Sequence, residues 1–294
     1  MSEKRRKLED HIREVIQRTG YPLEIEVSDI LEKDWVVFNN VPYLDEDENK
    51  TRTIDIYAIN YSELEQFVSI GKPVFFVSTP LLVECKRSDT HVWVFFTRPN
   101  STPGFGNGQT LDFLQVFTKG KKKFLDELLD FFRSDKLHYN RFSRLAHTYA
   151  EVKIQGESSE KQEIFEASNQ LMKFASYEIN KESERIAGDV SNRNFSFLFP
   201  VIAFDGMIYE AIVRGGEIKL LKRVHILLET SRYSKLTRNI LGYLIDVVAK
   251  PGFAQYLKLL NDDIETIRHF FESNEKELVE KVDVYDDLLK TGFG

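Results

Sequence analysis

The sequence predicts an α/β fold in which a mixed central sheet is flanked by helices. Segments rich in β-branched and aromatic residues alternate with segments whose apolar residues recur every three or four positions. The 294 residues are 42% hydrophobic and 30% charged, which supports a proper core and excludes a disordered protein. No apolar run approaches the roughly 20 residues that cross a bilayer, so we expect no membrane-spanning helix.

The N-terminal part predicts two helices followed by a β-hairpin. Apolar residues on one stripe indicate an exposed amphipathic helix at 4–18, which Gly20 ends. Pro22 suits the first turn of a second helix. The expected buried face of that helix carries Leu23, Val27, Ile30 and Leu31. Residues 35–44 and 51–59 are typical of two strands on either side of an acidic turn.

The remaining elements follow from the same patterns. Further strands are expected at 81–86, 91–97, 195–204, 208–213 and 224–229. Helices are expected near Glu63, at 111–133, at 165–186 and from 236 onward. The run 195–204 is almost uninterruptedly apolar, which is typical of a strand buried on both faces. Residues 99–109 are rich in Gly, Pro, Ser and Asn and indicate a loop.

We expect a single domain over residues 1–294. Its expected parts are a core at about 20–98 and 160–230, a helical insertion at 99–160, and C-terminal helices at 236–294. Cys85 is the only cysteine, so no internal disulfide can form, and the charged N-terminus lacks the apolar segment of a secretion signal. A cytoplasmic protein is therefore expected. The six histidines have no metal-ligand spacing and are expected on the surface or in the core.

Charge is distributed unevenly along the chain, whose net charge is −7. Residues 261–290 hold ten acidic and four basic residues, whereas 119–147 hold eight basic and four acidic, and 214–238 seven basic and two acidic. The ordinary interpretation of such a run is a solvated helix face. Beside a site that handles phosphates, the basic segments would instead bind nucleic acid. The candidate phosphate contacts are Lys121, Lys122, Lys123, Arg141 and Arg144.

Three charged residues stand on expected strands between apolar neighbours. Because side chains alternate along a strand, Glu84 and Lys86 project to one side and Cys85 to the other, into the core. Asp55 lies between two isoleucines, and burying its charge is costly unless something compensates it. If the two strands are neighbours, these residues converge. Paired carboxylates bind a hard cation such as Mg²⁺, which can activate water against a phosphodiester.

At these residues the chain resembles the PD-(D/E)XK nucleases, the restriction-endonuclease-like superfamily. The motif here is R-T-I-D-I at 52–56 followed by L-L-V-E-C-K-R-S at 81–88. The resemblance covers roughly the first 205 residues. It implies a restriction-endonuclease-like core of helix, three-stranded meander, helix and strand, and Mg²⁺-dependent cleavage of phosphodiester bonds, with Mn²⁺ as a substitute. Ile54 stands where the family name has proline.

The resemblance also implies roles for individual residues. Asp55 and Glu84 would be metal ligands, and the carbonyl of Cys85 would be a third. Lys86 would position the attacking water and stabilise developing charge, which makes Asp55, Glu84 and Lys86 the catalytic set. Many family members add an acid from the first core helix. Glu24 is the candidate for that acid here, with Glu26 as the alternative on the same helix.

The expected function is therefore a metal-dependent nuclease, with DNA favoured over RNA as the substrate. Cleavage of both strands of a duplex would favour a homodimer. The alternative is a non-catalytic module that keeps the nuclease fold and binds nucleic acid or a protein. A third hypothesis is a structural protein of a larger complex, docked through the acidic segment 261–290.

Overall fold

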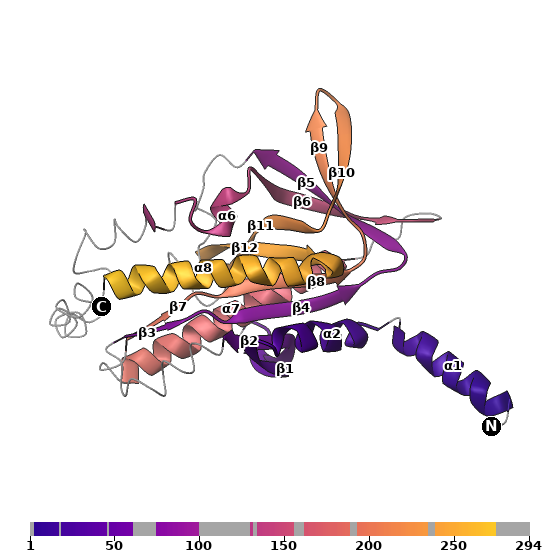
Figure 1. The fold of residues 1–294 in the computed structure, drawn as a ribbon, viewed down its shortest axis with the longest axis horizontal. Helices are drawn as coiled ribbons and strands as arrows, with labels where there is room; N and C mark the ends of the chain where they lie inside the picture. Colours follow the sequence, from indigo (N-terminus) through magenta and orange to yellow (C-terminus); the bar gives the residue numbers. More distant parts are fainter. Residues whose placement is uncertain are drawn as a thin grey trace.

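The protein is an α/β structure built around one large mixed sheet, as its computed structural model shows (Figure 1). The structure describes residues 3–17, 19–45, 47–60, 75–99, 130–131, 134–155, 162–188, 193–234 and 239–274. Among these residues, no helix combines the length and the apolar character needed to cross a membrane.

The main sheet has ten strands. Their spatial order is β1 (Trp35–Asp45), β2 (Lys50–Asn60), β4 (Leu81–Arg87), β8 (Phe199–Asp205), β12 (Asn239–Ala249), β11 (His225–Ser234), β6 (Arg144–Lys153), β5 (His91–Pro99), β9 (Ile208–Arg214) and β10 (Glu217–Arg223). A second, two-stranded sheet pairs β3 (Phe75–Ser78) in parallel with β7 (Arg193–Ser196).

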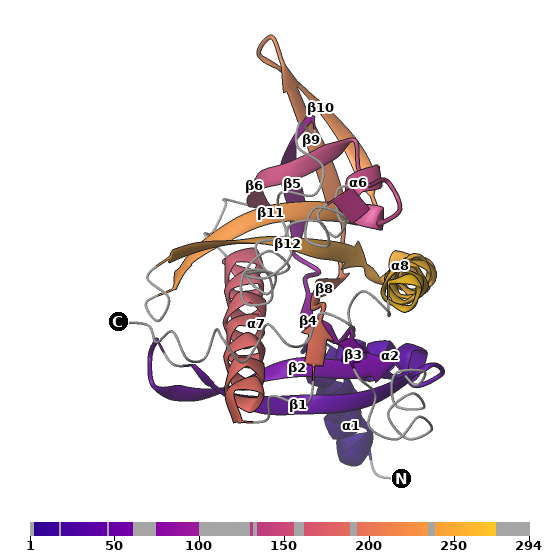
Figure 2. The same ribbon diagram turned by 90° about the vertical axis from the view of Figure 1, so that its left-hand side faces the viewer.

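Helices cover both faces of the middle of the sheet. The helices are α1 (Glu3–Gln17), α2 (Tyr21–Leu31), the short α6 (His138–Arg141), α7 (Glu163–Gly188), α8 (Phe253–Ser273) and the 3-10 turn η1 (Lys250–Gly252). Figure 2 shows α7 and α8 on opposite sides of β4 and β8. Two separate core clusters result, because each face of these strands buries its own apolar side chains.

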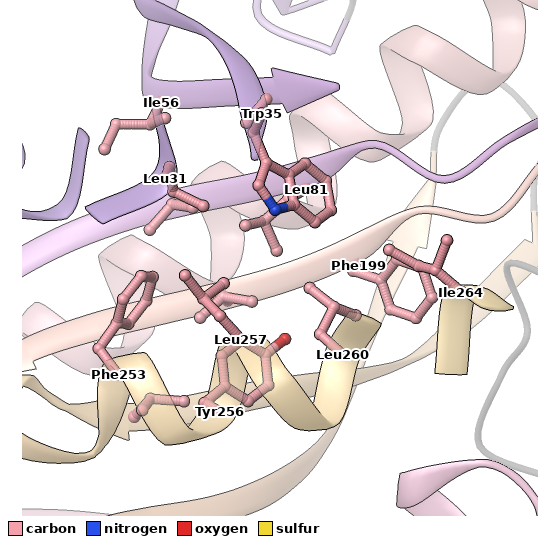
Figure 3. Packing of buried hydrophobic residues seen from close by; sticks show 14 of the residues in the cluster. Leu31, Trp35, Ile56, Leu81, Phe199, Phe253, Tyr256, Leu257, Leu260 and Ile264 are labelled. Carbon is pink, nitrogen blue, oxygen red and sulfur yellow. The ribbon is translucent and has the colours of Figure 1, made fainter. Parts of the chain in front are cut away.

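The first core cluster joins α2 and α8 to one face of the sheet (Figure 3). Leu23, Val27 and Leu31 form a buried stripe on α2 at intervals of four residues, and Pro22 occupies the first turn, where a missing N–H costs nothing. The stripe packs with Ile56 of β2 and with α8. The second cluster packs α7 against the other face, which carries Leu82 and other buried residues.

The four strands at one edge of the main sheet, β1, β2, β4 and β8, position the candidate site. β1, β2 and β4 pair antiparallel in sequence order, and β8 pairs in parallel with β4 over the whole of β4. The chain between β4 and β8 contains β5, β6 and α7, and α7 packs against β4 and β8. β4 therefore lies between two strands and under helices, and its first five residues are buried.

Most sequence predictions of helices and strands within the described residues are confirmed. Two are wrong. Residues 239–249 form strand β12 rather than the start of a C-terminal helix, and the insertion contains strand β6 at 144–153. In both cases, pairing with strands that are distant in the sequence overrides the local pattern. β12 becomes a central strand between β8 and β11, and β6 pairs with β5. The expected helix near Glu63 and the range 101–129 lie outside the described residues.

A buried network of charged groups fastens α6 and α8 to β12. The ring of His138 lies between two carboxylates, with Nδ1 2.5 Å from Asp263 Oδ2 and Nε2 3.1 Å from Asp246 Oδ1. Asp246 also accepts hydrogen bonds from His225 and from the hydroxyl of Tyr256. His138 is thus a core histidine whose polar atoms are satisfied, although no spacing in the sequence indicated its partners.

The network holds His138 in its charged form. Burial lowers the pKa of His138, but the carboxylates of Asp246 and Asp263 outweigh burial and raise it to about 9. Its contribution to stability is therefore fully present below the ordinary pKa of 6.5 and is lost as the pH rises towards 9. The pKa of Asp246 is lowered by the two histidines despite burial, so its contribution is lost only as the pH falls below 3.8.

We expect His138→Gln to lower the free energy of unfolding by about 3–5 kcal/mol at pH 6, because it leaves two buried carboxylates without their cation. The loss should shrink as the pH rises towards 9, where the wild-type imidazolium also loses its proton. Denaturant titrations across this pH range measure both effects. The matched control is His269→Gln on α8, since His269 is exposed. If both substitutions lowered the free energy of unfolding equally, His138 would not be the charged centre of this network.

Candidate functional site

The β2–β4 pairing brings the two motif strands together, as the sequence predicts. Ile56 lies opposite Val83, and the next step of this antiparallel register places Asp55 beside Glu84. Asp55 Oδ2 accepts a hydrogen bond of 2.7 Å from the backbone N–H of Cys85. Burial raises the pKa of Asp55, while that hydrogen bond and the ammonium of Lys86 oppose the rise. The carboxylate is thus partly desolvated and lies against β4.

Glu84 is the most constrained acid of the site. The residue is 0% exposed, and its Oε2 accepts a hydrogen bond of 3.2 Å from Lys86 Nζ. Its other carboxylate oxygen, Oε1, is buried without any hydrogen-bond partner. Burial, with a smaller contribution from the charge of Asp55, raises the pKa of Glu84 to about 8, although Lys86 and a weaker interaction with the backbone N–H of Asp55 oppose this. A buried carboxylate oxygen without a partner is costly, so this geometry favours a cation or a proton there.

Lys86 remains a cation in this setting. Burial lowers its pKa, but the carboxylates of Glu84 and Asp55 outweigh burial, so the pKa is raised. About a quarter of its side chain, 23%, remains exposed, so the residue is not sealed in the core as Glu84 is. Lys86 and Glu84 project to the same side of β4, as the strand alternation predicts.

Cys85 faces the opposite way from its neighbours on β4. The residue is 3% exposed and belongs to the first core cluster, which confirms its predicted position in the core. Burial and the surrounding acids raise the pKa of the thiol well above its ordinary value, so the thiol stays protonated. The backbone carbonyl of Cys85 is therefore the ligand atom that this residue can offer.

Gly20 and Glu24 bring α2 to the same place. A Cβ at Gly20, the N-cap residue of α2, would lie 3.5 Å from the carbonyl oxygen of Cys85 and 3.6 Å from Glu24 Oε1. Glu24 Oε1 and the carbonyl oxygen of Cys85 thus both lie within van der Waals range of position 20. Burial, reinforced by Asp55, raises the pKa of Glu24. Glu26 forms an ion pair with Lys250 instead, so Glu24 is the acid that α2 brings to the site.

The residues of this site suit a hard divalent cation. Three carboxylates whose pKa values are all raised interact with one ammonium, that of Lys86, and a buried carboxylate oxygen has no partner. Oxygen atoms of this kind are the ligands that Mg²⁺ prefers. Within the described residues, no three His, Cys, Asp or Glu side chains are already grouped closely enough to hold a metal ion. A cation would therefore draw the carboxylates closer together than they lie here.

The predicted phosphate contacts lie elsewhere or have other partners. Lys121, Lys122 and Lys123 are outside the described residues. Arg141 lies 3.4 Å from Asp263 and extends the His138 network to the surface. Arg144 donates hydrogen bonds to Thr97 and to Glu210, and its side chain is only 20% exposed.

Two residues near the site were not singled out from the sequence. The sequence indicates Gly20 only as the end of a helix, and Arg87 only as a member of the motif at 81–88. Arg87 donates a hydrogen bond to the carbonyl of Gln17 and lies 3.7 Å from Asp205, so it joins the end of α1 to the ends of β4 and β8. The signal for Arg87 is its position directly after Lys86, at the end of the motif strand.

Comparisons with family models, with curated proteins and with solved structures find no match to this chain. The geometry of the site and the motif at 52–56 and 81–88 are therefore the features from which a function can be inferred.

We expect Glu84→Gln to change how stability depends on pH in the metal-free protein. Because the pKa of Glu84 is raised from 4.5 to about 8, the folded state keeps a proton that the unfolded state releases, and wild-type stability falls over this interval. The glutamine variant lacks this fall, so its stability relative to wild type should rise with pH, by at most a few kcal/mol at ~1.4 kcal/mol per pKa unit.

Thermal unfolding in EDTA between about pH 5 and pH 8 measures this difference. Glu26→Gln is the matched control, because Glu26 stands on the surface of α2 with its side chain 48% exposed. A difference between Glu84→Gln and wild type that is constant across this range would show that Glu84 ionises normally.

Proposed function

We propose that this protein is a metal-dependent nuclease that hydrolyses phosphodiester bonds, with DNA favoured as the substrate. The observation that carries the proposal is the carboxylate of Glu84, which is fully buried beside Asp55 and Lys86 and has one oxygen without a partner. Burying such a carboxylate lowers the stability of the fold if it has only a structural role. A metal ligand, in contrast, is commonly a buried carboxylate with a perturbed pKa beside other charged groups.

The arrangement of strands and helices also supports the proposal. α2 precedes the antiparallel strands β1, β2 and β4, and α7 precedes β8, which is parallel to β4. The resemblance to the PD-(D/E)XK nucleases implies this order of helix, three-stranded meander, helix and strand. It also implies that the acid and the E-x-K motif lie on the second and third strands, where Asp55 and Glu84 are found.

Each residue then has a chemical role. Asp55, Glu84 and the Cys85 carbonyl would hold the cation, and Glu24 would support it from α2. A bound Mg²⁺ supplies polarisation of the phosphate and lowers the pKa of the attacking water. Lys86 keeps its proton and is placed to orient that water and to stabilise charge that develops on the phosphate. Glu84 must release its proton before it can ligate, so metal affinity should increase with pH.

We expect wild-type protein to bind Mn²⁺ in calorimetry with release of a proton, and to cleave at least one of linear, circular or single-stranded DNA, or RNA. Asp55→Ala should lose both properties, because it removes a ligand. Lys86→Ala should keep Mn²⁺ binding and lose cleavage by about 100-fold or more, because it removes only the charge that acts in the transition state. Glu26→Ala is the control that should behave as wild type.

Two results would contradict the proposal. Cleavage that is equal in wild type, Asp55→Ala and Lys86→Ala would show that the site is not at these residues. Binding of nucleic acid that is independent of metal, without cleavage of any substrate, would favour the non-catalytic binding module.

A further inference from the structure

A β-hairpin projects from the end of the sheet, away from the helices (Figures 1 and 2). Its two strands, β9 and β10, pair antiparallel over their full length, from Ile208 opposite Arg223 to Arg214 opposite Glu217. The turn between them is Gly215-Gly216, and both glycines have positive φ angles, of 58° and 86°. This backbone suits a tight two-residue turn that matches the twist of the strands, so the hairpin is a well-defined arm.

One face of this arm exposes apolar side chains. Val213, Ile218 and Leu220 are 53%, 60% and 55% exposed, and Ile218 lies opposite Val213 in the register. Leu220 lies opposite Ala211, at the point where the arm joins the body of the protein and Ala211 is buried. Exposed aliphatic side chains on adjacent positions of one face form a contact surface rather than a core.

The exposed part of the arm is basic although the chain has a net charge of −7. Arg214, Lys219 and Lys222 are exposed on it, against a single exposed acid, Glu217. Its other acid, Glu210, is buried and lies within hydrogen-bonding distance of both Arg144 and Arg223. By alternation, Lys222 shares the apolar face, and Lys219 and Arg214 lie on the opposite face. The arm therefore presents positive charge on both of its faces.

β9 and β10 stand at the other edge of the sheet from β2 and β4, but β9 starts close to the ends of β4 and β8, next to the candidate site. β8 ends at Asp205, whose carboxylate lies 3.7 Å from Arg87 at the end of β4, and β9 starts at Ile208. Seven residues of antiparallel strand extend ~24 Å, about two thirds of one turn of B-DNA. A duplex whose scissile phosphate lies near Lys86 would thus be long enough to meet the arm as well.

We propose that the β9–β10 hairpin is a nucleic-acid-binding arm that enters a groove of a duplex. The major groove admits a two-stranded ribbon, and the phosphates on its two sides would meet the basic residues on both faces of the arm. Ile218 and Leu220 would make apolar contact with the bases. This inference depends on the proposed function for its substrate class.

The edge strand β10 could instead pair with β10 of a second copy of this chain. The lysines on β10 disfavour this pairing. Among the described residues no strand lies beyond β10 in the sheet order. Antiparallel pairing of β10 with its own copy, centred on Leu220, would place Lys219 diagonally beside Lys219 of the other chain. Like charges on facing strands are destabilising, and edge lysines commonly prevent such pairing.

Anisotropy of a labelled duplex, measured with the full chain in EDTA so that no cleavage occurs, tests the proposal. We expect Lys219→Glu/Lys222→Glu to weaken binding by about tenfold or more and to reduce the slope of log affinity against log salt by about 2, because two phosphate contacts are lost. Ile218→Ser/Leu220→Ser should weaken binding without changing that slope. The matched control is Lys33→Glu/Lys258→Glu, which reverses two exposed lysines on other elements.

The outcomes separate this inference from the proposed function. Arm variants that bind the duplex as tightly as wild type, while wild type binds or cleaves it, would overturn the arm alone. If the control variant lost as much affinity for the duplex as Lys219→Glu/Lys222→Glu, the arm would also be overturned. The change in net charge would then explain both losses. Light scattering that shows a wild-type dimer and a monomeric Ile218→Ser/Leu220→Ser would assign the surface to a second copy. A wild type that binds no nucleic acid would overturn both proposals.

Discussion

The burial of β4 between β2 and β8 is the constraint on which the rest of the site depends. With strands on both edges and helices over both faces, β4 can hold Glu84 away from water while Lys86, two residues further along, reaches solvent. The same pairing places Asp55 against the backbone of Cys85. The apolar stripe of α2 packs on the face of the sheet that carries the Cys85 side chain, and this packing brings Glu24 to the site. It also sets Gly20 near the Cys85 carbonyl.

The two groups of buried charges in the protein differ in how they are satisfied. Around His138, carboxylates, imidazole rings and a tyrosine hydroxyl pair with one another, and the group works as a structural clamp between β12, α6 and α8. At Glu84 the acids outnumber the single ammonium, their pKa values are raised, and one oxygen has no partner. Buried charges that pair with one another can hold parts of a fold together. An excess of buried carboxylates lowers stability and favours the binding of a cation.

The distribution of charge extends this contrast to the surface. An acidic chain would repel nucleic acid as a whole, so the proposed nuclease activity would need a local basic surface near the site. Two of the residues that a charge count suggests for that role, Arg141 and Arg144, have acidic partners in the structure. The β9–β10 hairpin instead carries Arg214, Lys219 and Lys222 on exposed positions at the end of the molecule.

The sequence alone determined the elements whose patterns are local: the two N-terminal helices, the β1–β2 hairpin, the motif strand β4 with Cys85 turned into the core, and the buried strand β8. It also determined that Asp55, Glu84 and Lys86 belong together, because strand alternation and the motif both indicate it. Tertiary structure decided the rest. Strand β12 exists because β8 and β11 bury it, and His138 meets Asp246 and Asp263 over more than 100 residues. The contact range between Gly20 and the Cys85 carbonyl depends on helix packing that no local pattern records, whereas the preference for Glu24 over Glu26 was already indicated by the sequence.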